Sequence, residues 1–325
     1  MTLLLTRSDL ESVFDPAGCL AALRRGFTAG KAGGDAARRV VARPPGPGTA
    51  TALLPGVVEG IPAYTVKVNA KFPGSRPALR GVVCLHDLGT GELLALLDSA
   101  TVTAWRTGLA AALGTHVLAR PGADAVAVVG AGAQAELVMR GLAALRPVRG
   151  LAVHDLDPGR AEAFAARHGA RLGLDAAALT SYGEVPGAIR EAVRDAGIVV
   201  TATWARRPIL DAPDVPPGAH VTSLGADEPG KAELAPALLR EARVVVDDVG
   251  LAAEMGALAG AGPEVERSAV ALGDVLAGRA PGRRGETERT VYAPVGLPWQ
   301  DLALSWAAFE MARSKAVGQE FDFLR

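Results

Sequence analysis

The sequence has few cysteines, almost no net charge and no long hydrophobic run. Its two cysteines, Cys19 and Cys84, are far apart and follow no metal-binding or redox spacing, so we expect both to be small buried side chains. A net charge of −1 provides neither a basic face for nucleic acid nor an acidic tail. The first residues lack the pattern of a signal peptide, and no apolar run is long enough to span a bilayer. These absences predict a soluble cytoplasmic protein with no nucleic-acid or membrane partner.

A chain of 325 residues can form two domains with separate cores. Apolar spacing predicts a helix over residues 6–31, strands between 38 and 97, and a helix over 101–118. From residue 125 strands and helices alternate, beginning with a strand over 125–129 and a helix over 133–145, which is typical of a parallel sheet with helices on both faces. We therefore predict an α/β fold with a Rossmann-type doubly wound sheet in residues 119–300. A second, α+β domain would comprise residues 1–118 and 301–325, with an amphipathic helix over 302–315 crossing back to it.

The stretch from Val126 to Ala135 predicts a dinucleotide-binding turn between a strand and a helix. Gly130 would allow the tight turn, Gly132 would let the main chain approach a pyrophosphate, and Ala135 would keep the helix close to the strand. The N–H groups at the start of the helix would then face the phosphates. Such a turn alone is weak evidence, because many α/β proteins with a Gly-Ala-rich turn bind nothing there.

A carboxylate in the right place strengthens this hypothesis. The next predicted strand ends at Asp155, roughly 20 residues on, where a carboxylate can accept both ribose hydroxyls. Asp155 favours NAD over NADP because it would repel a 2′-phosphate. Arg160 lies close behind, so the preference is not absolute.

Several polar residues follow predicted strands or interrupt apolar patterns, and each allows a second interpretation. Asp227 and Lys231 lie in a Gly- and Pro-flanked loop, where Asp227 could also be a solvated turn carboxylate. Lys67 interrupts an apolar alternation, and an exposed strand face would explain it equally well. Arg106 is either a side chain that snorkels from the core edge or a bidentate carboxylate clamp. The five histidines show no ligand spacing, so we predict no metal site.

Several motifs occur together in a family-specific order. They are Lys67-Val-Asn-Ala-Lys-Phe-Pro, Gly81-Val-Val, Gly91-Glu-Leu-Leu-Ala-Leu-Leu-Asp, Thr103-Ala-Trp-Arg-Thr-Gly, Val129-Gly-Ala-Gly-Ala-Gln-Ala, Val200-Thr-Ala-Thr, Gly225-Ala-Asp-Glu-Pro-Gly-Lys-Ala-Glu-Leu, Gly273-Asp-Val-Leu-Ala-Gly and Val295-Gly-Leu followed by Gln300-Asp-Leu-Ala. In this combination, from about residue 38 to 310, the chain resembles the ornithine cyclodeaminase/μ-crystallin family.

The resemblance implies a homodimer formed through the α+β domain and an active site in the cleft between the two domains. Lys67 and Arg106 would hold the substrate carboxylate together with an N-terminal arginine, which is Arg39 or Arg43. Asp227 would be the acid/base group, and Lys67 would also be catalytic. The cofactor NAD would be contacted by Thr107, Gly130, Gly132, Ala133, Gln134, Asp155, Thr203, Leu224, Lys231 and Val295.

The implied activity is that of an NAD-dependent oxidoreductase acting on the Cα–N bond of a small L-amino acid or its imine. Alternatives are an ornithine or lysine cyclodeaminase, which recycles its NAD and releases ammonia, and a non-catalytic ligand-binding protein. Two departures argue against a diamino acid. The segment 49–55 has no acidic residue for a distal ammonium, Glu59 being the nearest, and Pro294 stands where a small polar residue is expected.

Overall fold

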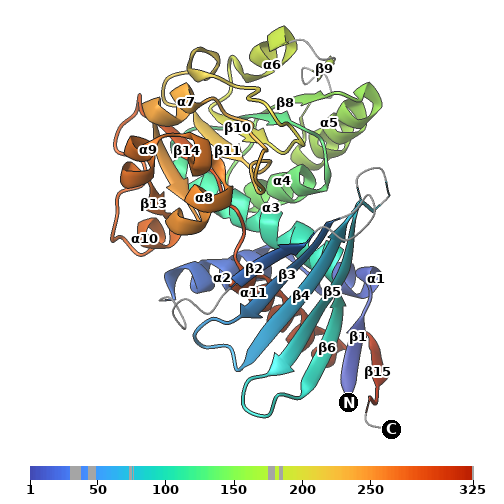
Figure 1. The fold of residues 1–325 in the computed structure, drawn as a ribbon. Helices are drawn as coiled ribbons and strands as arrows, with labels where there is room; N and C mark the ends of the chain where they lie inside the picture. Colours follow the sequence, from blue (N-terminus) through green and yellow to red (C-terminus); the bar gives the residue numbers. More distant parts are fainter. Residues whose placement is uncertain are drawn as a thin grey trace. The chain divides into compact units, whose positions relative to one another are not determined.

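The structure, a computed structural model, describes residues 1–29, 38–42, 49–72, 75, 77–174, 180–182 and 186–323. The chain forms two compact units (Figure 1): unit 1 contains Met1–Thr107 and Leu297–Arg325, and unit 2 contains Gly108–Gly296. The first boundary lies inside the helix α3 (Ser99–Leu118), not after residue 118, and the second lies just before the expected residue 300.

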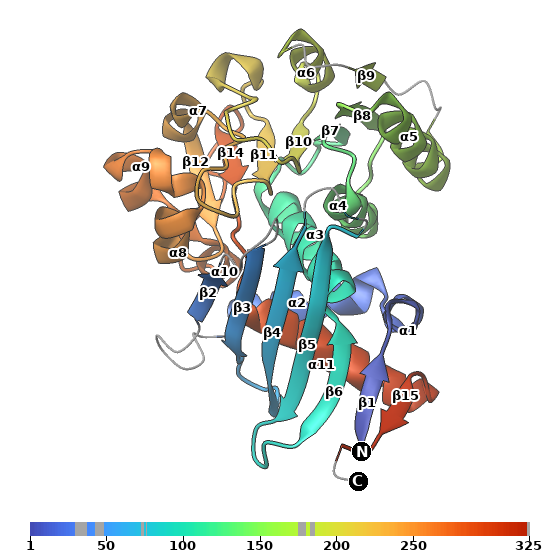
Figure 2. The ribbon, with the colours of Figure 1, turned by 45° about the vertical axis from the view of Figure 1, so that its right-hand side comes forward.

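Unit 1 is built on a mixed sheet. Its strands are β1 (Thr2–Leu5), β2 (Arg38–Ala42), β3 (Thr49–Gly56), β4 (Ala63–Lys71), β5 (Leu79–Asp87), β6 (Leu93–Asp98) and β15 (Gln319–Phe321), and its helices are α1 (Arg7–Val13), α2 (Pro16–Thr28), the start of α3, and α11 (Pro298–Lys315). The strand order is β15-β1-β6-β5-β4-β3-β2, in which only the β1–β6 pair is parallel. Figure 2 shows this sheet with α11 lying across one face, where it packs on β3, β4 and β5.

Three expectations about unit 1 were wrong. The helix predicted over 6–31 is two helices, because Asp15 caps a new helix that begins at Pro16; residues 30 and 31 lie outside the described residues. The helix predicted over 302–315 begins at Pro298, and its first two turns are buried on nearly every side instead of being amphipathic. Cys19 is buried, which raises the pKa of its thiol to about 12, but Cys84 is only half-buried.

Unit 2 confirms the predicted doubly wound sheet. Its strands are β7 (Ala125–Val129), β8 (Gly150–Asp155), β9 (Thr180–Tyr182), β10 (Ile198–Thr201), β11 (His220–Ser223), β12 (Ala242–Val246), β13 (Val270–Ala271) and β14 (Arg289–Tyr292). Its helices are the rest of α3, α4 (Ala133–Leu145), α5 (Pro158–Leu172), α6 (Pro186–Val193), α7 (Pro236–Glu241), α8 (Val249–Met255), α9 (Pro263–Ser268) and α10 (Leu272–Leu276), with 3-10 turns η2 (Ala212–Asp214) and η3 (Ala257–Gly260).

All strand pairs of this second sheet are parallel, and the order is β13-β12-β14-β11-β10-β7-β8-β9. The order reverses between β7 and β10, which is the point where doubly wound sheets bind ligands. Buried aliphatic clusters fill both faces, as expected for a sheet covered by helices on each side. Among the described residues, no helix combines the length and the apolarity needed to cross a membrane.

Candidate functional site

The inward face of β4 carries a buried lysine. Thr65, Lys67 and Asn69 alternate along this strand and are all buried, and the Lys67 side chain is only 1% exposed. The apolar Val66 and Val68 lie on the opposite, more exposed face. The interpretation of Lys67 as an exposed residue is therefore wrong, since the polar row faces the interior of unit 1.

Lys67 is held by a carboxylate from the start of α11. Its Nζ donates to Asp301 Oδ2 at 2.6 Å and to Thr103 Oγ1 at 3.2 Å. Arg106 forms a second ion pair with this carboxylate, with 3.3 Å between Nε and Asp301 Oδ1, and its Nη1 donates to Gln300 Oε1 at 3.4 Å. Arg106 is 8% exposed and Asp301 is 1% exposed, so Arg106 is not a snorkelling side chain at the core edge. The cluster brings two cations onto one buried anion.

Some hydrogen-bonding capacity around this cluster is unused. Arg106 Nε and Asp301 Oδ1 form an ion pair, but neither atom has a hydrogen-bond partner among the described residues. Five other buried atoms of unit 1 also lack a hydrogen-bond partner among the described residues: Asn69 Oδ1, Ser99 Oγ, Thr107 Oγ1, Gln300 Nε2 and Ser305 Oγ. Buried polar atoms normally have a partner, so these atoms indicate room for water or for a polar ligand.

The N-terminal arginine can be placed only by its backbone. In the strand register Arg39 lies opposite Leu53, and Leu53 lies opposite Lys67, so Arg39 belongs to the row of Lys67 across three strands. Its side chain is not among the described parts of the chain, and the alternative, Arg43, lies wholly outside them.

In unit 2, the turn after β7 fits a dinucleotide. Gly130 has φ +95°, and a Cβ there would lie 2.6 Å from Ala202 O at the end of β10, so this turn requires glycine. At Gly132 a Cβ would meet no described atom within 4 Å, which indicates open space in front of the turn. Gly132 is also the N-cap of α4 and supplies no side-chain cap, so the N–H groups of Ala133 and Gln134 stay available to an anion.

Asp155 ends β8 beside this turn. Its Oδ2 accepts from Ala131 N at 2.8 Å and its Oδ1 accepts from Asp157 N at 2.9 Å, and Arg160 Nη2 lies 2.9 Å from Oδ1. The carboxylate therefore stabilises the glycine turn. Arg160 is tied to it by an ion pair.

A buried glutamate that we did not predict joins the carboxyl ends of β10 and β11 through hydrogen bonds. Glu233 is fully buried and accepts five hydrogen bonds, from Thr201 Oγ1, Thr203 N and Oγ1, Ser223 Oγ and Gly225 N, at 2.6–2.7 Å. Thr203, a predicted cofactor residue, is thus fixed through Glu233. The buried Leu224, also predicted, follows Ser223 at the end of β11.

Asp227 lies in the loop that Glu233 anchors. Lys231 Nζ donates to Asp227 Oδ1 at 2.8 Å and lies 4.5 Å from the centre of the Trp204 ring. The Asp227 side chain is about one quarter exposed, and that of Lys231 is nearly buried. Asp227 is therefore held in an ion pair and is not a freely solvated turn carboxylate.

The end of β12 positions the loop of Val295. Asp247 Oδ1 accepts from Val295 N at 3.0 Å, and Asp247 Oδ2 accepts from Gly296 N at 2.6 Å. Val295 is buried, and a Cβ on Gly256 would lie only 2.7 Å from its Cγ2. Thus Gly130, Asp155, Asp227 and Val295 all follow carboxyl ends of parallel strands in unit 2, the edge at which such sheets bind ligands.

Comparison with known proteins identifies the family. The sequence pattern of the ornithine cyclodeaminase/mu-crystallin family matches residues 3–316. The chain belongs to this family. It is 33% identical to an alanine dehydrogenase of Archaeoglobus fulgidus over 259 residues, which are 77% of this chain and 76% of the relative.

Solved structures of family members are similar over nearly the whole chain. An archaeal alanine dehydrogenase dimer with bound NAD has a TM-score of 0.87 at 28% identity and covers 99% of both chains. The Delta(1)-pyrroline-2-carboxylate reductase of Thermococcus litoralis, in complex with NADH and L-proline, has a TM-score of 0.88 at 26% identity, with 98% of this chain and 100% of the other covered. The similarity confirms the predicted fold class and family.

Within this family member, the structural importance of Glu233 can be tested. In Glu233→Gln one carboxylate oxygen becomes an amide NH₂ group, which cannot accept a hydrogen bond. This group must face the N–H of either Thr203 or Gly225, so that backbone N–H loses its acceptor. We expect the free energy of unfolding to fall by about 2–4 kcal/mol in a denaturant titration. The exposed Glu266→Gln on α9 is the control and should change it by less than about 0.5 kcal/mol. Equal stability of the two variants would contradict the anchoring role.

Proposed function

We propose that this chain is an NAD-dependent oxidoreductase acting on the Cα–N bond of a small L-amino acid or its imine. The observation that carries the proposal is the buried cluster of Lys67, Arg106 and Asp301. Two cations and one anion leave one positive charge, which a substrate carboxylate would balance. The open glycine turn in unit 2 supports the assignment of the cofactor.

Arg106 is suited to bind the substrate carboxylate. Its Nε lies 3.3 Å from Asp301 Oδ1 without a hydrogen bond, so this atom can donate to a ligand without breaking one. A planar guanidinium binds a carboxylate through two parallel N–H bonds. Lys67 would add a second charge, kept in place by Asp301 and Thr103. We assign the same task to Arg39, whose backbone lies in the row of Lys67.

When bound, NAD supplies the hydride acceptor or donor for the Cα of the substrate. The first N–H groups of α4 and the helix dipole would bind its pyrophosphate next to Gly130 and Gly132. Asp155 would accept from a ribose hydroxyl, while Thr203 and Val295 would form part of the wall around the cofactor. We also assign Thr107, Gln134, Leu224 and Lys231 to cofactor contacts.

Asp227 would move the protons that accompany hydride transfer. Oxidation of an amine to an imine removes a proton from nitrogen, and reduction returns it. Lys231 holds Asp227 Oδ1 and Glu233 fixes the loop, so the carboxylate is oriented before the substrate binds.

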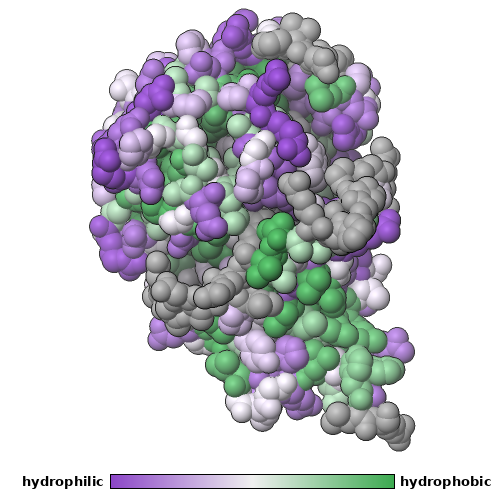
Figure 3. Space-filling view, viewed as in Figure 1, coloured by the Kyte–Doolittle hydropathy of each residue, from purple (hydrophilic) through white to green (hydrophobic). Residues whose placement is uncertain are grey.

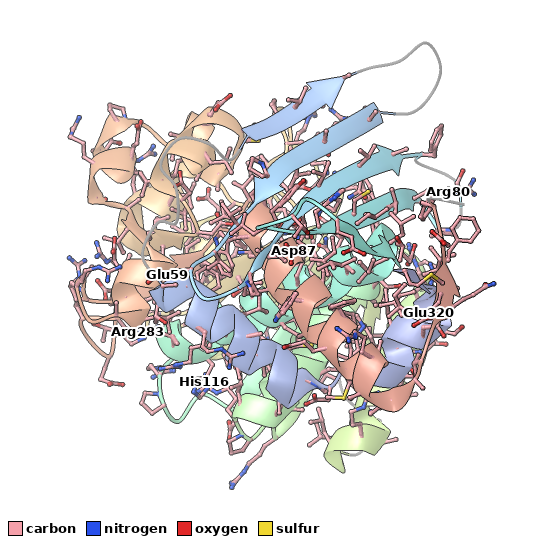
Figure 4. The ribbon with its side chains drawn as sticks, turned by 90° about the horizontal axis from the view of Figure 1, so that it is seen from below. Glu59, Arg80, Asp87, His116, Arg283 and Glu320 are labelled. Carbon is pink, nitrogen blue, oxygen red and sulfur yellow. The ribbon has the colours of Figure 1, made fainter. Side chains whose placement is uncertain are left out.

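The features around the cluster favour a small substrate. Glu59, the carboxylate nearest in sequence for a distal ammonium, is exposed in the turn between β3 and β4 and is labelled in Figure 4. Among the groups next to Lys67 and Arg106, Thr103 and Gln300 are neutral, and the carboxylate of Asp301 is already paired with both cations. A single α-carboxylate with a small or cyclic body matches these groups better than a diamino acid.

A direct assay tests the activity. The protein is incubated with NADH and either pyruvate plus ammonium or a cyclic imino acid, and NADH absorbance is followed. Net consumption of NADH with formation of the L-amino acid is the expected result. Release of ammonia from ornithine or lysine with no net change in NADH would instead establish a cyclodeaminase. Binding of NADH without turnover of any of these compounds would contradict an enzymatic role.

The choice of cofactor gives a second test, centred on Asp155. We expect NADH to bind at least about tenfold more tightly than NADPH, because a 2′-phosphate would lie against this carboxylate. Asp155→Ser should weaken NADH binding and remove most of that preference in a fluorescence titration. Asp157→Ser is the matched control, since serine still caps α5 and the preference should persist. Tighter binding of NADPH by the wild-type protein would overturn the assignment.

We further propose that the chain forms a homodimer through the outer face of the unit 1 sheet. Val40, Ala52, Val68 and Val82 are successive partners across four strands on this face, and Val68 is 47% exposed. Val66, Cys84 and Leu96 form a second apolar row. Figure 3 shows hydrophobic surface gathered over these strands. Exposed apolar patches of this kind mark protein contacts.

The dimer can be tested by measuring mass in solution by light scattering. The wild-type protein should have twice the mass of the chain, and Val68→Lys should raise the dimer dissociation constant by about 100-fold or more by burying a charge. Leu88→Lys, in the exposed turn after β5, is the control and should remain dimeric. A monomeric wild-type protein would contradict the proposal.

A further inference from the structure

A second group of cationic side chains lies in unit 2, at the edge of the sheet opposite to the turn of Gly130 and Gly132. A cavity of about 690 Å³ is lined by the ends of α3 and α4 and by the segment that leads into β14. His116 and Arg283, labelled in Figure 4, lie in its wall together with Arg146, Arg284 and Glu286. Arg283 also donates to Ala219 O and Arg146 to Arg120 O, both before strands begin, so the cavity is at the amino edge of the sheet.

Part of this charge has a structural task. Arg283 Nε donates to Leu118 O at 2.9 Å, and Arg146 Nη2 donates to Arg120 O at 2.6 Å and to Pro121 O at 3.0 Å. These carbonyls end or follow the last turn of α3, where cations also interact favourably with the helix dipole. Arg284 is paired with Glu288 at 2.6 Å.

The hydrogen bonds to these carbonyls do not use all the donors of Arg146. This side chain is 8% exposed, and its Nε and Nη1 have no hydrogen-bond partner among the described residues. The Nε of the neighbouring Arg120 also lacks one there. Burial lowers the pKa of both Arg146 and Arg283, and the charge of Arg120 lowers that of Arg283 further, while nearby carboxylates act in the opposite direction on each. The unused buried donors of Arg146 favour an anion in the cavity.

We propose that this cavity is a second ligand site, which binds a small organic anion through Arg146. The anionic end, a phosphate or a carboxylate, would accept from the unused Arg146 nitrogens. Its body would lie against the apolar part of the wall, formed by Val117, Leu145 and Val275. A volume of several hundred cubic ångströms is typical of metabolite sites. This site is independent of the reaction assigned above, because none of its residues follows a carboxyl end of the sheet.

Calorimetric titration at constant ionic strength tests the site, with and without saturating NADH. The probes are phenyl phosphate, benzoate and inorganic phosphate, which separate the two anionic groups from the contribution of an apolar body. We expect phenyl phosphate or benzoate to bind whether or not NADH is present, and inorganic phosphate to bind more weakly. Arg146→Gln should weaken binding by about tenfold or more, because two charge-assisted hydrogen bonds are lost.

Two further variants cover the case in which Arg146→Gln does not fold. Arg284→Gln removes an exposed charge from the wall, and Val275→Phe fills the cavity while keeping every cation. Both should weaken binding, and Arg279→Gln, which removes an exposed arginine paired with Asp274, should not. Failure of all three probes to bind, or equal affinity in Val275→Phe and the wild-type protein, would overturn the proposal.

Discussion

Asp227→Asn is expected to lower kcat by about 10²- to 10⁴-fold, the usual contribution of a positioned acid/base group. Asparagine keeps an oxygen that can accept from Lys231, so the loop should hold its shape while the side chain can no longer take up a proton. The dissociation constant for NADH should change by less than about twofold, because the anion-binding turn is elsewhere in unit 2. Steady-state kinetics and an NADH titration give the two values.

Glu228→Gln is the matched control. Glu228 is adjacent in the chain, has nearly the same exposure as Asp227, and lies 3.8 Å from the same Lys231. This variant should keep kcat within about threefold of the wild-type value, as expected for a weakly interacting, partly solvated charge. If both variants lost activity equally, the loop as a whole would be important and Asp227 would have no separate acid/base role. The limb of the pH–rate profile that belongs to Asp227 should disappear only in Asp227→Asn.

Lys67→Met is expected to reduce kcat/KM by about 100-fold or more and also to destabilise unit 1, since breaking a buried ion pair costs about 3–5 kcal/mol. The variant removes a positive charge from the substrate carboxylate and leaves Asp301 with Arg106 as its ion-pair partner. Loss of activity alone would therefore not separate a binding role from a structural one.

The double variant Lys67→Met/Asp301→Leu separates these roles. Replacing both members of a buried pair by apolar side chains is often neutral for stability, but Arg106 then loses its own pairing with Asp301, so the denaturation midpoint should recover only in part. We expect kcat/KM to stay low, because the substrate still lacks the Lys67 charge. Recovery of activity together with stability would show that Lys67 only balances Asp301.

The alternation of strands and helices was sufficient to predict the doubly wound sheet of unit 2. The predicted helix over 133–145 and strand over 125–129 have the observed bounds, because a glycine turn and a run of β-branched residues separate them clearly. The short strands β1, β9, β13, β14 and β15 were missed. Segments of two to four residues are too short for a periodic signal, and pairing partners distant in the sequence determine them.

The site was predicted less completely, for a different reason. Alternation places Thr65, Lys67 and Asn69 on one face but does not say which face is inside, and here the polar row is the buried one. Asp301, Glu233 and Asp247 act through partners on other elements, such as Lys67, which is 234 residues away from Asp301. Asp301 did leave a signal, since Gln300-Asp301 are polar residues at the start of a largely apolar helix.

Because Lys67 and Asp301 are 234 residues apart, unit 1 cannot be completed early during synthesis on the ribosome. Unit 1 is completed by α11 and β15, which are translated after the whole of unit 2. At about 5–20 residues per second, the 234 residues between Lys67 and Asp301 take roughly 12–47 s to make. During that time the N-terminal sheet lacks the helix that covers its inner face, and Lys67 lacks its carboxylate. Unit 2 can therefore fold first, and the nascent N-terminal strands must wait, exposed to chaperones and proteases, for the last segment.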